Sequence, residues 1–111
     1  MLIRIRYAST LAPDTTSTDI DDVVEWSTGW NRAHQITGVL AVEGDMVMQI
    51  LEGPGAEVLK LFASIRSDSR HFGVVELQNE PIVSCRFADW GLARLSMAEM
   101  LMLAEDLDAK P

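Results

Sequence analysis

Residues 35–55, QITGVLAVEGDMVMQILEGPG, contain the pattern that decides the fold. Two apolar runs, 35–42 and 46–51, flank Glu43-Gly44-Asp45, which is typical of a hairpin turn, so we expect two antiparallel strands. In the second run, Met46, Met48 and Ile50 lie on one face of the predicted strand, and Val47, Gln49 and Leu51 lie on the other. A strand that is apolar on both faces is buried on both sides. This strand therefore belongs in the middle of a sheet.

The segments on either side of the hairpin complete an α+β pattern. Residues 2–8 alternate apolar and polar side chains as a strand does, and Thr18 followed by Asp21 resembles a capping box. In chain order, the predicted elements are strand 2–8, a helix from about Thr18 to Ala33, strands 35–42 and 46–51, a helix that ends near Asp68, strands 74–77 and 87–95, and a helix over 96–107. This β-α-β-β-α-β-β order predicts a ferredoxin-like sheet with two helices on one face.

Each predicted helix carries an apolar stripe at helical spacing. The first stripe is Ile20, Val23 and Val24, and it continues into two polar residues, Ser27 and Asn31. We expect the second helix to bury Val58, Leu59, Leu61, Phe62 and Ile65, and the last to bury Met97, Met100, Leu101 and Ala104. A short helix with one apolar side is unstable alone in water, so the last helix should cover the second sheet face or a partner.

Length and composition restrict the function. The 111 residues fit one domain, and the single cysteine, Cys85, allows no intrachain disulfide. The net charge of −8 argues against nucleic acid, which needs clustered Lys and Arg. No apolar run approaches the roughly 18 residues that span a membrane, and no signal peptide is evident, so we expect a cytoplasmic protein without membrane contact. His34 and His71 lack the spacing of a metal site.

Three polar residues occupy positions where apolar ones are expected. Tyr7 shares a strand face with Ile3 and Ile5, Gln49 lies within the central strand, and Asn31 continues the apolar stripe of the first helix. Taken singly, they are compatible with a core tyrosine, an amide bonded to backbone and a helix-end cap. Together, a phenol and two amides match the edge of a ring that bears C=O and N–H groups. A flavin has such an edge, but spacing alone does not select it over other heterocycles.

Six short stretches together resemble the BLUF family. They are Arg6-Tyr-Ala-Ser9, Trp30-Asn31 followed by Ile36-Thr-Gly-Val-Leu40, Met48-Gln-Ile-Leu-Glu-Gly-Pro54, Asp68-Ser-Arg-His71, Glu80-Pro-Ile82 and Arg86-Phe-Ala-Asp-Trp90. The resemblance covers about residues 1–95, which we take as a photosensor core, with 96–111 as a C-terminal helix and tail. It implies a blue-light photoreceptor that binds oxidised flavin, usually FAD, with FMN also open.

The resemblance also implies roles for particular residues. Tyr7 matches the photoactive tyrosine and Gln49 the switching glutamine, so that light drives electron and proton transfer between Tyr7 and the flavin through Gln49. The flavin-binding positions that match are Tyr7, Ser27, Asn31, Gln49, Arg70 and His71. Asn31 matches the residue at the C4=O and N3–H edge, and Arg70 and His71 match residues near C2=O and the ribityl-phosphate side. For these two, a solvated helix end is the structural alternative.

Two positions depart from the family pattern, and a third cannot be oriented. Trp30 stands where relatives often carry Asn or His, and it can stack on the flavin or pack away from it. Leu92 replaces the methionine that usually follows two places after the tryptophan of the last strand. Trp90 is present, but the sequence does not say whether it points in or out. Trp90 and Leu92 are the candidates for passing the signal on.

No substrate-binding group is evident, so we expect a sensor and not an enzyme. Nothing after residue 95 resembles a cyclase or phosphodiesterase, so the signal passes to an unidentified partner protein, or the chain is part of a longer one. We expect a homo-oligomer, for which a dimer is one form. The alternatives are a flavin-free ferredoxin-like interaction module and a small flavin-dependent oxidoreductase.

Overall fold

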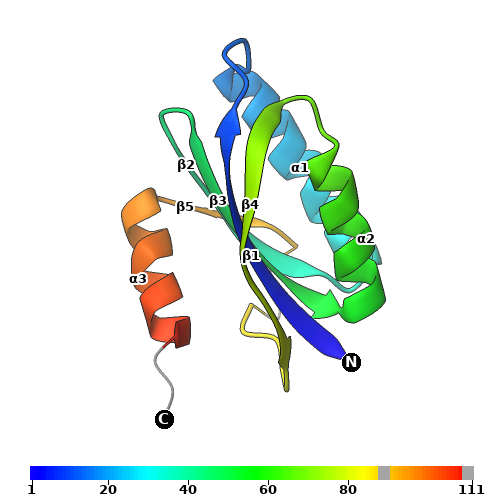
Figure 1. Ribbon diagram of the computed structural model, residues 1–111. Helices are drawn as coiled ribbons and strands as arrows, with labels where there is room; N and C mark the ends of the chain where they lie inside the picture. The colour runs from blue at the N-terminus through cyan, green and yellow to red at the C-terminus, as the bar shows by residue number, and fades with distance from the viewer. Residues whose placement is uncertain (88–90, 109–111) are drawn as a thin grey trace.

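The predicted hairpin forms the middle of a five-stranded mixed sheet (Figure 1). The computed structural model describes residues 1–87 and 91–108. The central strands β2 (Thr37–Glu43) and β3 (Met46–Pro54) pair antiparallel, and β3 also pairs antiparallel with β1 (Leu2–Leu11). The strand order is β4-β1-β3-β2-β5, in which only β5 runs parallel to its neighbour β2. The strand predicted to lie in the middle of the sheet, β3, is therefore central, between β1 and β2.

Two helices cover one face of the sheet and a third covers the other (Figure 1). They are α1 (Ser17–Ala33) and α2 (Gly55–Arg66) on one side and α3 (Met97–Asp108) opposite. This arrangement confirms the ferredoxin-like α+β prediction. The capping box was placed wrongly, because the side chain of Thr16 accepts from the Asp19 amide and the Asp19 carboxylate accepts from the Thr16 amide. The same residue types recur two positions later, and the sequence pattern alone could not separate them.

The two faces of the sheet bury separate apolar clusters. Under α2, the cluster contains Ile3, Ile5, Tyr7, Ile36, Leu51, Val58 and Phe62. Under α3, it contains Val39, Ala41, Ile50, Phe87, Met97, Met100 and Leu107. Two helix positions predicted to be buried are not, since Leu59 is 50% and Leu101 54% exposed. Both lie at the margin of their stripes. Met46, predicted on the apolar face of β3, is also exposed, because it lies at the hairpin end beyond α3.

The outer strands differ most from the prediction. The first, β4 (His71–Ile82), is three times longer than the predicted 74–77. As an edge strand with one open side, it tolerates Pro81 and a polar composition that obscures the strand pattern. The second, β5 (Ala93–Leu95), is a short parallel strand where residues 87–95 were predicted. Residues 88–90 lie outside the described part. None of the described helices is both long and apolar enough to cross a membrane.

Candidate functional site

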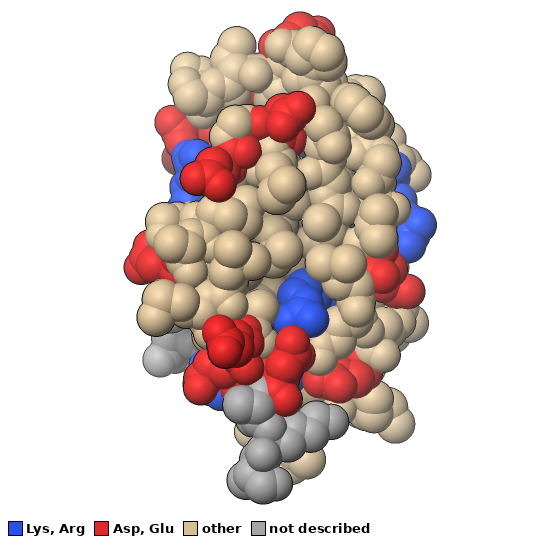
Figure 2. All heavy atoms as spheres, turned by 60° about the vertical axis from the view of Figure 1, so that its left-hand side comes forward, with Lys and Arg blue, Asp and Glu red and all other residues tan. Residues whose placement is uncertain are grey.

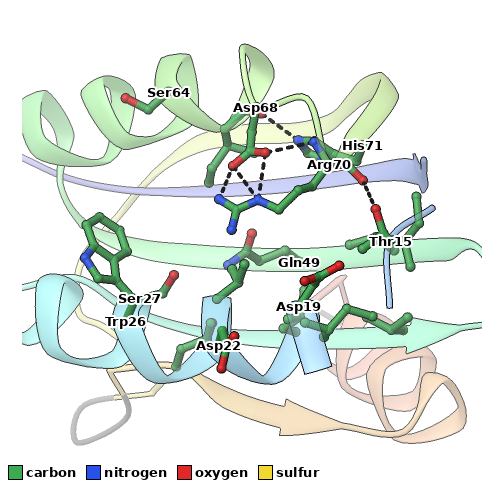
Figure 3. A pocket seen from close by; sticks show the side chains of 18 of the residues that line it. Thr15, Asp19, Asp22, Trp26, Ser27, Gln49, Ser64, Asp68, Arg70 and His71 are labelled. Atoms are coloured by element: carbon green, nitrogen blue, oxygen red, sulfur yellow. Dashed lines mark hydrogen bonds and ion pairs between the residues drawn. The ribbon is translucent and has the colours of Figure 1, made fainter. Parts of the chain in front are cut away.

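Most of the apolar stripe of α1 faces a cavity, and only Val24 of the stripe packs against a buried cluster among the described residues. Asn31 is the one buried residue of this helix, whereas Ile20 and Val23 line a cavity of about 590 Å³. Leu61 and Ile65 of α2 form the opposite wall. Figure 3 shows the cavity between the two helices, with Gln49 in the centre. Cavities of this size hold drug-sized ligands, usually between apolar walls with a few convergent polar groups.

Tyr7 and Gln49 form a hydrogen-bonded pair on the floor of the cavity. They are direct cross-strand partners in the β1–β3 pairing, and the Tyr7 hydroxyl donates to Oε1 of Gln49. Both residues are buried and both line the cavity. Burial, followed by the negative charge of Asp68, raises the pKa of Tyr7 well above its usual value. The phenol therefore remains protonated at neutral pH and keeps its proton on the bond to Gln49.

Asn31 presents a free acceptor atom at the wall of the cavity. Its Nδ2 donates to the Gly91 carbonyl at 2.7 Å, and this glycine lies so close to α1 that an added Cβ would be 2.5 Å from the Thr28 carbonyl oxygen. Its Oδ1 is buried and has no hydrogen-bond partner within 1–87 and 91–108. The side chain is 1% exposed, so an unfilled acceptor there costs roughly 1–3 kcal/mol. The side chain is not a helix-end cap, and a ligand N–H would satisfy it.

Arg70 and Asp68 form an ion pair at one end of the cavity (Figure 3). The Asp68 carboxylate accepts from the Arg70 backbone amide at 2.9 Å, and from its Nε and Nη2 at 2.9 and 2.5 Å. Hydrogen bonding to this guanidinium lowers the pKa of Asp68 to about 2. Arg70 therefore fits only in part the alternative that it is a solvated residue at a helix end. Its side chain is half-exposed, but it also lines the cavity.

His71 is fixed by two protein partners. Its Nε2 lies 2.6 Å from the Ile65 carbonyl oxygen and its Nδ1 lies 2.7 Å from Oγ of Ser9. A carbonyl can only accept, so Nε2 carries the proton that it donates to Ile65, and Nδ1 is hydrogen-bonded to the serine hydroxyl. The ring also meets Tyr7 edge-on, with centroids 6.2 Å apart. His71 lines the cavity, but both its nitrogens are already engaged within the protein.

The other predicted positions are distributed around the same cavity. Ser27, Trp30 and Leu92 line it, and Leu92 is buried against Leu40 and Val47. Trp30 stacks on His34 with ring centroids 3.7 Å apart. Trp90 lies outside the described residues. Seven of the eight predicted site and signalling residues therefore line one cavity: Tyr7, Ser27, Asn31, Gln49, Arg70, His71 and Leu92.

Sequence reasoning missed several residues that also line this cavity. Trp26 is 63% exposed and stacks on Trp30 at 6.1 Å, and the carboxylates of Asp19 and Asp22 line the cavity on the α1 side (Figure 3). One signal was available for Trp26, because it precedes Trp30 by four positions and residues so spaced share a helix face. The aspartates gave no signal, since acidic residues in the first turns of a helix are common.

The chemistry of the cavity fits a heteroaromatic ring with an amide edge. Within the described ranges, Asn31 has an unfilled acceptor and Nε2 of Gln49 has no hydrogen bond, and both side chains line a cavity whose walls are mainly apolar. The described residues contain no cluster of three or more His, Cys, Asp or Glu that could hold a metal ion.

Comparison with known proteins gives a consistent result. The family model of BLUF, described as sensors of blue light using FAD, matches residues 2–93. The chain is 30% identical over 92 residues to the blue light- and temperature-regulated antirepressor BluF of Escherichia coli K12, a match that covers 83% of this chain and 23% of that protein. This chain spans about a quarter or less of the length of the curated relatives it matches.

Solved structures show the same fold. BlrB, a BLUF protein in its dark state, superimposes with a TM-score of 0.83 at 33% identity, over 96% of this chain and 80% of that one. BlrP1 of Klebsiella pneumoniae with FMN and cyclic diGMP gives a TM-score of 0.83 at 34% identity, over 96% of this chain and 30% of that one.

Proposed function

This chain belongs to the BLUF family of blue-light sensors, and from that premise we propose that its cavity holds an oxidised flavin whose light response depends on Tyr7 and Gln49. The observation that carries the proposal is the convergence of the Tyr7–Gln49 hydrogen bond and Asn31 Oδ1, which has no partner among the described residues, on one cavity. When bound, the flavin supplies the light absorption and the one-electron chemistry.

Asn31 and Gln49 would orient the ring. The buried Oδ1 of Asn31 is suited to accept a ring N–H, which removes the cost of an unfilled acceptor. Its Nδ2 uses one of its two N–H donors on Gly91, so the second N–H can donate to a ring carbonyl beside the bond that Oδ1 accepts. Ser27, Arg70 and His71 line the cavity and complete the proposed binding set.

Gln49 would act as the switch because its two amide ends are chemically different. In this structure Oε1 accepts from Tyr7, so Nε2 is the end available to donate toward the cavity. Rotation or tautomerisation of the amide would exchange the groups that it presents on its two sides. A raised pKa keeps the proton on Tyr7 in the resting protein, so any transfer of this proton awaits a change of charge in the cavity.

The output passes to another protein or another part of a longer chain. One relative is a light-regulated antirepressor, and the chain covers only part of such proteins, so we propose a sensory module without catalysis of its own. FAD is the expected flavin from the family description, and FMN remains possible because BlrP1 has been crystallised with it.

One spectrum tests the proposal. We expect the purified protein to be yellow, and blue light to shift its absorption reversibly by a few nanometres to the red with the flavin still oxidised. A protein that stays colourless after incubation with FAD would instead support the flavin-free interaction module. Photobleaching by an added substrate would support the oxidoreductase.

A further inference from the structure

We propose that Asp68 sets which flavin this site prefers, by occupying the guanidinium of Arg70 and so removing most of the gain from a flavin phosphate. The inference rests on the proposed function and deepens it. It predicts that the site recognises the ring and the ribityl chain, so that riboflavin, FMN and FAD bind with similar affinity. The specificity-determining residue would be Asp68, which is not among the residues proposed to contact the flavin.

The charges around the cavity are unfavourable for a phosphate. Asp19, Asp22 and Asp68 line it, whereas Arg70 is the one Lys or Arg among its described lining residues. This local excess is part of a net charge of −8 over the whole chain. Opposite charges within a few ångström attract and like charges repel, with a strength that falls as solvent and salt screen them. A phosphate would therefore meet three carboxylates for each guanidinium.

Arg70 is already paired in the geometry that an anion would use. Its Nε and Nη2 both donate to the Asp68 carboxylate, at 2.9 and 2.5 Å, and Figure 3 shows this pair facing the centre of the cavity. Arginine recognises carboxylates and phosphates through the same two-pronged arrangement. Asp68 also accepts the Arg70 backbone amide, which holds the two residues together within one turn. A phosphate must displace this carboxylate or approach beside it.

Among the described residues, His71 and Thr15 lie beside Arg70, and neither replaces it as a phosphate donor. His71 donates from Nε2 to the Ile65 carbonyl, and its Nδ1 is occupied by Ser9. The hydroxyl of Thr15 donates to the Arg70 carbonyl at 3.0 Å (Figure 3). The groups nearest to Arg70 are thus already hydrogen-bonded inside the protein. The contribution of a flavin phosphate to binding affinity therefore depends on how strongly Asp68 holds Arg70.

The test measures three ligands that differ only beyond the ribityl chain. Dissociation constants for riboflavin, FMN and FAD are obtained by fluorescence titration of the full chain, stripped of bound flavin. In the wild type we expect the FMN and riboflavin constants to agree within about threefold, because the Arg70 charge is neutralised. In Asp68→Asn we expect FMN to gain roughly three- to tenfold over riboflavin, as Arg70 becomes free to bind the phosphate.

Two further variants separate this mechanism from a general charge effect. Asp22→Asn removes the same charge from the cavity lining without releasing Arg70, so its FMN-to-riboflavin ratio should change much less than that of Asp68→Asn. The double variant Asp68→Asn with Arg70→Gln should lose the gain completely. Riboflavin affinity is the internal control for folding, because a misfolded variant would lose all three ligands.

The outcomes distinguish this inference from the proposed function. If none of the three flavins binds the wild type, both proposals are wrong. If they bind and the red shift occurs, but Asp68→Asn leaves the ratio unchanged or shifts it no more than Asp22→Asn, the role of Asp68 is overturned and the proposed function stands. The role of Asp68 would also be overturned if the wild-type protein already bound FMN about a hundredfold more tightly than riboflavin.

Discussion

The helices α1 and α3 cover opposite faces of one sheet, yet they relate to it differently. Helix α3 packs directly on the strands and buries Met97, Met100, Ala104 and Leu107. Helix α1 has a comparable apolar stripe, but Asn31 is its one buried residue and the stripe lines a cavity. An apolar stripe therefore shows that a helix face avoids water, without showing whether protein or a ligand lies against it.

Acidic side chains lie on the α3 side of the sheet, as they do around the cavity. Figure 2 brings α3 toward the viewer and shows acidic side chains gathered around its C-terminal end, where negative charge opposes the helix dipole. Two arginines offset this charge, Arg6 by pairing with Asp108 and Arg86 by pairing with Asp106. Exposed ion pairs contribute little, so apolar packing holds α3 in place. The sheet face under α3, which we call the filled face, should thus govern the free energy of unfolding. The face that borders the cavity, which we call the hollow face, should govern flavin binding and the light response.

The largest expected effect is on the hollow face. Tyr7→Phe should abolish the light-induced red shift while flavin stays bound, because Phe packs similarly but has no hydroxyl to donate to Gln49. Gln49→Ala should also abolish it, and difference spectra before and after blue light measure both. Leu61→Ala, on the cavity wall, is the control that should keep a red shift. A normal photocycle in Tyr7→Phe would contradict the proposed role of this residue.

The second effect tests the filled face. Met100 is fully buried, so Met100→Ala should lower the free energy of unfolding by about 2–5 kcal/mol. Val23→Ala, on the cavity-lining stripe of α1, should cost less than about 1 kcal/mol in the flavin-free protein, because its side chain already faces open space. Urea unfolding of both variants measures the difference. Equal losses would mean that α1 is packed as tightly as α3.

The third effect concerns flavin affinity. Asn31→Ala should weaken flavin binding by roughly 1–3 kcal/mol, because the ring N–H would lose its acceptor. The photocycle of the fraction that still binds should change less than the affinity does. Equilibrium dialysis with FAD measures the dissociation constant. An unchanged constant would show that Asn31 serves only to bond Gly91 and join α1 to the segment that leads into β5.

The smallest effect links the two faces. We expect light to reduce the hydrogen-exchange protection of residues 97–108, since α3 follows β5 directly and packs on the far side of β2 and β3. The methionines at this interface can repack at low cost. Exchange measured by mass spectrometry in darkness and under blue light tests this expectation. Equal protection in both states would make α3 a static cover, with the signal leaving elsewhere.

The central elements could be predicted because they repeat simple periodicities. The hairpin of β2 and β3 has alternating apolar residues on both sides of a turn, and the register that sets Tyr7 opposite Gln49 follows from the neighbouring central strands. Edge strands are constrained on one side only, so the polar β4 gave no clear pattern and its 12 residues were underestimated. Leu59 and Leu101 were misplaced because residues at the margin of a stripe differ in exposure without differing in spacing.

The sequence by itself determined the fold class and the central position of β3. It also determined the three positions, Tyr7, Asn31 and Gln49, at which a polar residue stands where an apolar one is expected. Periodicity and residue type encode these features locally, through burial and hydrogen-bonding cost. Only the tertiary structure decided that α1 stands away from the sheet and leaves a cavity, and that Asn31 uses one end of its amide for Gly91 and leaves the other unpaired. It also decided that Asp68 holds Arg70. These outcomes depend on the distances between elements, which a linear pattern of residue types does not specify.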